Sequence, residues 1–417
     1  MAGVEKRWQK WAISLAPSLL LIVGSALISV LKIIKIGVKM YKLISGAFLV
    51  TAAGISTSAF ASTGTIASGY GAKNITMGGT SIALPYDSMA AANNPAGMAK
   101  VGTRTDLNLR YFKGTAHNTY GSEDNKNSIN MTTLIPEGGA NYQIDDDWTF
   151  GVTMYGGGFS SEYKKPIIPA PGLDKFRGSL AILTLAPTFT YKVRPDLYLG
   201  LSVNYNYAII DPQGVPGLDA GKQTAHGWGY KLGVLWEPVN DWTFGAAYSP
   251  KSKLSKFNGY EDNLLASSDG HYESVEHFAL GTAWKVTPQL TLALDYLRYN
   301  WENVDFFNKE SGSGYRNQNV WRVGVAYEVT ERFSVQAGYS HANDFVTSDY
   351  TLGSYIGPAI SARSWGAGAS YSFDGGYEVT AGIERHIPRS LKGTGPSEGT
   401  NLDVDYGFLV FGFSKKF

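Results

Sequence analysis

The stretch Leu197–Tyr207, which reads LYLGLSVNYNY, predicts the fold of this chain. Leucine, valine and tyrosine occupy every second position, and small or polar residues fill most of the positions between them. Successive side chains of a β-strand point to opposite faces, so this alternation indicates a strand with one apolar and one small, polar face. The same pattern recurs in WTFGVTM at 148–154, WTFGAAY at 242–248 and FSVQAGY at 333–339.

Turn sequences divide the chain into many such strands. Short segments, most of which contain Asp, Pro or Asn, predict tight turns near 144–147, 192–196, 237–241, 285–289, 328–331 and 373–376. Longer polar links fall between them, at about 114–128, 160–178, 211–223, 251–270, 305–315, 346–358 and 389–400. Six turns and seven links would join fourteen strands, with short turns at one end and long loops at the other, as in a bacterial outer-membrane barrel. A β-propeller has repeats of similar length, but its packed blades would not explain long polar loops on one side only.

Composition supports a membrane barrel. The 417 residues include 49 Gly, 26 Tyr, 19 Phe and 10 Trp, with only 17% charged residues and a net charge of +1. Tyr and Trp favour membrane–water interfaces, and the near-zero charge argues against nucleic-acid binding. The absence of cysteine excludes disulfides and thiol chemistry, and the six histidines show no metal-ligand spacing, so we expect no metal and no cofactor. The predicted fold is all-β: a 14-stranded antiparallel transmembrane β-barrel over 103–417, in the outer membrane of a Gram-negative bacterium.

The N-terminal residues resemble an export signal. Residues 40–61 combine a basic start, an apolar run and an Ala-Phe-Ala ending, which predicts a signal peptide cleaved after Ala61. Residues 1–39 are then an upstream extension preceding a true start at Met40; a membrane anchor at Trp11–Ile36 is the alternative. The alternating C-terminal aromatics end on Phe417 and look like the signal read by the outer-membrane assembly machinery.

Residues 62–102 do not alternate and are rich in glycine and alanine. Within them Asp87, the small residues 88–92 and the motif Asn94, Pro95, Ala96, Gly97 stand ahead of the first strand. In this order of features the chain resembles the outer-membrane long-chain fatty-acid transporter family of the FadL/TodX type. The resemblance implies that 62–102 form a hatch, a plug folded inside the barrel, in a protein that is a monomer and not an enzyme. The alternative is that the motif is only a surface turn.

The resemblance also implies a side opening in the barrel wall, beside the third strand. Two weak points fall in that region: Gly156, Gly157 and Gly158 end the predicted third strand, and Pro136, Gly138 and Gly139 interrupt the second. Glycine weakens a strand, and proline cannot complete a hydrogen-bond ladder. These residues are the candidate lateral opening; alternatively, the glycines only relieve crowding against the plug.

Alternation also places Lys231 and Arg322 on the inward face, on the same side as Asp295 and Glu384. Either cation could bind a ligand carboxylate, or both could form salt bridges within the lumen. Apolar residues in three long loops, Ile167–Leu173, Val215–Leu218 and Leu264–Leu265, suggest a surface that captures hydrophobic molecules or packs the loops together.

The expected function is passive uptake of a hydrophobic small molecule, with long-chain fatty acids first and aromatic hydrocarbons as the alternative. The expected partners are this substrate, outer-membrane lipid and lipopolysaccharide, and the assembly machinery. An outer-membrane lipase or esterase is the alternative from another class. His226 and His341 stand on apolar faces and are its candidate residues.

Overall fold

The computed structural model describes residues 64–166, 175–215, 217–218, 220–358 and 360–417. In this part of the chain, fourteen antiparallel strands of one sheet form a barrel, which closes because the last of them pairs back with the first. The strands are β1 (Arg104–Thr119), β2 (Lys126–Gln143), β3 (Trp148–Tyr163), β4 (Phe176–Arg194), β5 (Leu197–Ile210), β6 (Gln223–Val239), β7 (Trp242–Ser249), β10 (His277–Lys285), β11 (Leu290–Tyr299), β12 (Gln318–Glu328), β13 (Phe333–Ala342), β14 (Arg363–Phe373), β15 (Tyr377–His386) and β17 (Leu402–Lys416). The predicted 14-stranded barrel is confirmed.

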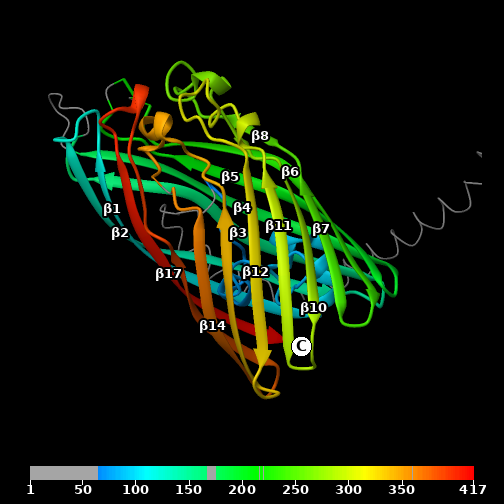
Figure 1. Cartoon of the computed structure of the whole chain (residues 1–417). Coiled ribbons are helices and arrows are strands. Elements are labelled where there is room, and N and C mark those ends of the chain that lie inside the picture. The colour runs from blue at the N-terminus through cyan, green and yellow to red at the C-terminus, as the bar shows by residue number, and fades with distance from the viewer. Residues whose placement is uncertain (1–63, 167–174, 216, 219, 359) are drawn as a thin grey trace, which may run out of the picture. The chain divides into compact units, whose positions relative to one another are not determined.

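Tight turns join the strands at one end of the barrel and longer loops join them at the other, as Figure 1 shows. The loop after β7 carries the hairpin β8 (Ser252–Lys256) and β9 (His271–Ser274), together with η2 (Ala266–Ser268). Short helices occupy the next two loops, namely η3 (Trp301–Asn303), η4 (Ser348–Tyr350) and α4 (Thr351–Ser354). The last loop holds β16 (Arg389–Leu391), which extends the sheet beside β17, and η5 (Gly395–Ser397). Several strands run further into the loops than the sequence predicts; β1 and β2 leave only residues 120–125 between them.

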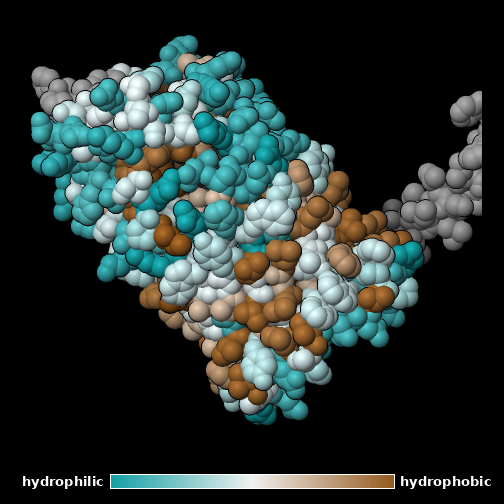
Figure 2. Space-filling model, in the orientation of Figure 1, coloured by the Kyte–Doolittle hydropathy of each residue, from teal (hydrophilic) through white to brown (hydrophobic). Residues whose placement is uncertain are grey.

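The two faces of the wall differ as the alternation predicts. On β5, Leu199, Leu201 and Val203 point outward and are 39–44% exposed, whereas Ser202 and Asn204 point into the lumen and are buried. Apolar residues colour much of the wall below the hydrophilic loop region in Figure 2. At the turn end, the rings of Trp242 and Trp284 stack with centroids 5.2 Å apart. An apolar outer face with aromatic residues at the border is the surface that a bilayer requires. Within the described ranges, no helix has the length and apolarity needed to cross a membrane.

The N-terminal segment folds inside the barrel. Its helices α2 (Ala72–Thr76), α3 (Ala90–Asn93) and η1 (Pro95–Lys100) contact the inner faces of the strands and are almost entirely buried. Inward-facing glycines make room for it. Gly200 and Gly233 are cross-strand partners on β5 and β6, and a Cβ atom on Gly200 would come within 2.3 Å of the Ala96 nitrogen. The barrel is therefore plugged, with wall and plug shaped to each other.

The predicted signal peptide at 40–61 and the extension at 1–39 lie outside the described residues. The predicted capture segment Ile167–Leu173 also lies outside them. The boundaries 62–102 and 103–417 remain predictions, although β1 begins close to the expected barrel start, at Arg104.

Candidate functional site

The Asn94-Pro95-Ala96 motif holds the hatch against the barrel wall. The Asn94 amide donates to the backbone oxygens of Ile82, at 2.7 Å within the hatch, and of Val234, at 2.9 Å on β6. Its side-chain oxygen accepts a hydrogen bond from the Ala96 nitrogen and so caps η1. The Pro95 carbonyl accepts from the Thr190 hydroxyl of β4 at 2.9 Å. Asn94 is 1% exposed. One side chain therefore joins two parts of the hatch to the wall.

Asp87 lies at the centre of a buried polar cluster. Its carboxylate accepts a hydrogen bond from the Met89 nitrogen at 2.9 Å and lies near Asp106, which is paired with Arg104. Burial, and then repulsion from Asp106, raise the pKa of Asp87 to about 8. Close by, Glu137 of β2 accepts a hydrogen bond from the Gly71 nitrogen just ahead of α2. The seat of the hatch thus includes a carboxyl group that titrates slightly above neutral pH.

Lys231 and Arg322 point into the lumen, and both contact the hatch. Lys231 Nζ donates to the Ala92 carbonyl, and Arg322 donates to the Gly79 carbonyl at 3.2 Å. Beside Arg322, the Asp295 carboxylate accepts from the Ser81 nitrogen at 2.7 Å. Glu384 instead pairs with His386, at 3.0 Å. These wall charges mainly bind hatch backbone or a neighbour on the same strand.

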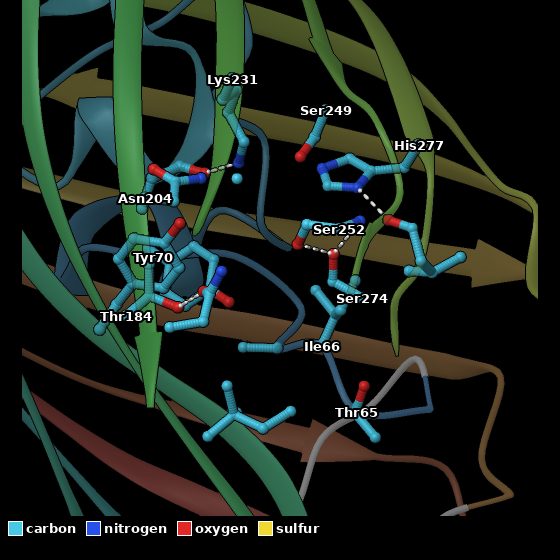
Figure 3. Close-up of a pocket in the computed structure, with 18 of the residues that line it drawn as sticks. Thr65, Ile66, Tyr70, Thr184, Asn204, Lys231, Ser249, Ser252, Ser274 and His277 are labelled. Carbon is cyan, nitrogen blue, oxygen red and sulfur yellow. Dashed lines mark hydrogen bonds between the residues drawn. The ribbon is translucent and has the colours of Figure 1, made fainter. Parts of the chain in front are cut away.

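A cavity lies between the hatch, the inner wall and the loops. It has a volume of about 110 Å³ and is open to solvent at its mouth. Figure 3 shows Lys231 of β6 and His277 of β10 on one side of it, with Thr65, Ile66 and Tyr70 of the hatch segment on others. The lining combines these groups with tyrosine rings, and the centroids of Tyr70 and Tyr155 are 4.6 Å apart. It can therefore receive a ligand that is mainly apolar and carries a polar or anionic end.

The wall beside this cavity contains a seam where two strands are not paired. β2 and β3 pair only from Gly138 with Met154 to Gln143 with Thr149, whereas β1–β2 and β3–β4 stay paired beyond this level. Continued in the same register toward the loops, the ladder would next place Glu137 opposite Tyr155, and then Pro136 opposite Gly156. Proline has no N–H to donate, and glycine weakens a strand. The two sequence irregularities therefore face each other at the end of the ladder.

The hatch and a loop cover part of this seam from inside. The Gly158 nitrogen donates to the Thr65 carbonyl at 2.9 Å, and Gly158 has a φ of +124°, a conformation that favours glycine. Above them, the ring of Tyr163 on β3 stacks on Tyr355 of the loop after β13, with centroids 4.8 Å apart. Gly156 and Gly157 also line the cavity. The cavity thus reaches the unpaired edge of β3.

The sequence pattern alone does not mark several residues of this site. Thr65, Tyr70 and His277 line the cavity, and Glu137 holds the hatch between the noted Pro136 and Gly138. Only Glu137 carries a sequence signal of its role, because it is a charged residue at an inward-facing position of its strand. His226 and His341 lie exposed on the outer face. In the described ranges, no cluster of His, Asp or Glu could hold a metal ion.

A closed membrane barrel with a lumen plug and an internal cavity defines an outer-membrane transport channel. The chain belongs to the outer membrane protein transport family (OMPP1/FadL/TodX), whose model matches residues 48–408. Members of this family are transporters of hydrophobic compounds in the Gram-negative outer membrane and are not enzymes. The predicted family, location and absence of catalysis are confirmed, and the lipase alternative is not supported.

Solved structures share this fold. The Pseudomonas putida toluene transporter TodX is 20% identical, with a TM-score of 0.65, 84% of this chain covered and 99% of that one. A Pseudomonas aeruginosa FadL homologue is 16% identical, with a TM-score of 0.63 and the same coverage. The Ralstonia pickettii toluene transporter TbuX is 16% identical, with a TM-score of 0.60 and again the same coverage. No curated protein sequence matches the chain.

Proposed function

We propose that this channel takes up long-chain fatty acids, which enter the lumen cavity from the loop end and leave sideways through the β2–β3 seam. The observation that carries the proposal is the continuity of the cavity with the unpaired edge of β3 at Gly156 and Gly157. A hydrophobic molecule leaving through the wall would enter the bilayer directly and avoid the aqueous periplasm. The buried hatch blocks the alternative route straight down the lumen.

The lining of the cavity supports an acid as the substrate. Lys231, His277 and Arg322 all border it, so an anionic head would find cationic or hydrogen-bonding partners. A wholly apolar ligand would instead separate these groups from water without replacing their hydrogen bonds. The acyl chain would lie against apolar lining such as Ile66, Leu254 and Val275.

Monoaromatic hydrocarbons are the second candidate substrate class. Two of the similar structures are named as toluene transporters. The Tyr70–Tyr155 ring pair at the cavity could hold an aromatic ring by tilted stacking.

Uptake of labelled oleate and toluene tests both the route and the substrate. Gram-negative cells lacking their own transporter would express the wild-type chain or the double variant Pro136→Cys/Gly156→Cys. The chain has no cysteine, so a disulfide could form only between the introduced pair. We expect oxidation to reduce oleate uptake and a reductant to restore it, because the bridge closes the seam.

The matched control is Ala140→Cys/Val152→Cys, which bridges a pair already joined in the ladder. It should leave uptake unchanged. Uptake of oleate through a verified Pro136–Gly156 bridge would refute the lateral route. Uptake of toluene but not oleate by the wild type would refute the fatty-acid assignment and support the aromatic one.

A further inference from the structure

The outer wall carries a border of charged and polar residues above its apolar band. On β11 to β15, β17 and β1, the outward apolar residues run up from the tight turns and give way toward the loops to a polar or charged side chain. From β11 round to β1 these border residues are Arg298, Asn319, His341, Arg363, Arg385, Asp405 and Lys113. The border lies at the end of the barrel that carries the long loops, and Figure 1 shows several of these strands reaching it.

The charge of this border is mainly positive. Four of its residues are Arg or Lys and one is Asp. The loop-facing halves of β5, β6, β7 and β10 hold no outward Arg or Lys. Arg385 forms an ion pair with Asp405, whereas Lys113 and Arg363 form none with any residue that the structure describes. The border therefore has unneutralised positive charge next to an apolar surface.

A groove opens in the wall within this border. Gly407 of β17 is the cross-strand partner of Arg385 on one side and of Lys113 on the other. Since Gly407 has no side chain, a hollow is left between the two cations. The groove has a volume of about 540 Å³, and its lining also includes Asp405, the ion-pair partner of Arg385, together with Tyr111, Trp365, Ile383 and Leu409. Two cations and the Asp405 carboxylate form its upper rim, which keeps a net positive charge, and apolar side chains form the surface below them.

We propose that this groove binds the lipid A part of lipopolysaccharide. A lipid A phosphate would lie between Lys113 and Arg385, and acyl chains would follow Ile383 and Leu409 down the wall. Arginine and lysine bind phosphate by charge-assisted hydrogen bonds, and basic pockets beside membrane-spanning segments bind lipid head groups. The outer leaflet, which the loop end of the barrel faces, is the one that contains lipopolysaccharide. The site is on the opposite face of the wall from the substrate cavity and does not depend on the identity of the substrate.

Binding of purified lipid A to the full chain in detergent tests this assignment. Native mass spectrometry would give the dissociation constant of wild type and of Lys113→Gln/Arg385→Gln. The matched control is Lys222→Gln/Lys285→Gln, which removes two positive charges from a loop and from the turn end of β10. Each cation near a lipid head group contributes about fivefold to binding. We therefore expect affinity to fall about 25-fold in the groove variant and to stay unchanged in the control.

Dephosphorylated lipid A and phosphatidylglycerol identify what is recognised. The proposal requires weaker binding of the dephosphorylated form, and tighter binding of lipid A than of phosphatidylglycerol. Equal affinity of wild type and groove variant for lipid A would overturn it, as would equal binding of lipid A and phosphatidylglycerol. An unboiled gel shift confirms that each variant is a folded barrel, so that weakened binding is not misread from an unfolded chain.

Discussion

Replacing Asn94 by alanine should loosen the hatch without disturbing the barrel. The wild-type side chain makes three buried hydrogen bonds, to the Ile82 and Val234 oxygens and from the Ala96 nitrogen. Each is worth about 1 kcal/mol net, so the variant should destabilise the seated hatch by about 3 kcal/mol. Because 1.4 kcal/mol is a factor of ten, the unseated population should rise on the order of 100-fold. The substitution removes no hydrogen bond between neighbouring strands, so the barrel itself should stay intact.

Ion conductance in a planar bilayer measures this population directly. A seated hatch fills the lumen, so openings of the wild-type channel should be rare, and Asn94→Ala should raise their frequency on the order of 100-fold. Asn263→Ala is the matched control, since the Asn263 amide also donates to two carbonyl oxygens but is exposed in a loop. It should conduct like the wild type.

A cross-link separates hatch movement from damage to the wall. Lys100 of η1 and Glu237 of β6 form an ion pair at 2.8 Å, and cysteines at these positions could be joined by a short bis-maleimide. In the Asn94→Ala background this link should return conductance to the wild-type level. Unchanged conductance of Asn94→Ala, in protein that a gel shift shows to be folded, would refute the assignment of the motif as the hatch anchor.

Three further perturbations test the hatch and the cavity. The pKa of Asp87 is raised from 3.8 to about 8, so the protonated carboxyl group favours the seated hatch. This stabilisation of the seated hatch is complete below pH 4 and is lost as pH rises through 8, so channel conductance should increase between pH 4 and pH 8. Asp87→Asn should abolish this pH dependence, and exposed Asp124→Asn should retain it; a pH-independent wild type would contradict the mechanism. Lys231→Met should lower oleate uptake several-fold but leave toluene uptake unchanged in paired assays, and equal losses would argue against recognition of the carboxylate. Gly200→Leu should displace η1 and raise conductance, because even its Cβ would lie 2.3 Å from the Ala96 nitrogen; normal conductance would show that the wall can yield there.

The barrel could be predicted from sequence because strand alternation is a local property. In Leu197–Tyr207 each side chain faces either lipid or lumen, and a two-residue period records that choice directly. Turn residues divided the pattern into the right number of strands. Strand ends were less accurate, since residues such as Ala116 and Asn118 continue β1 into a region too polar to be recognised as wall. There the neighbouring strands decide where pairing stops.

The candidate site could be predicted only in part. Pro136 and Gly156–Gly158 interrupt the strand pattern visibly in the sequence, but their position opposite each other depends on the β2–β3 register. The cavity residues Thr65, Tyr70 and His277 come from distant parts of the chain, and nothing in their local sequence marks them.

The sequence by itself determined the class of this protein: alternating strands and turns of two lengths suffice for an outer-membrane barrel, and the plug followed only from the family resemblance of residues 62–102. The tertiary structure alone decided where the plug lies, which wall charges hold it and where the wall is unpaired. The physical reason is the separation along the chain of the residues that interact. Alternation results from the geometry of one strand in its solvent, whereas Asn94 meets Val234, and Gly407 separates Arg385 from Lys113, only after the barrel has closed.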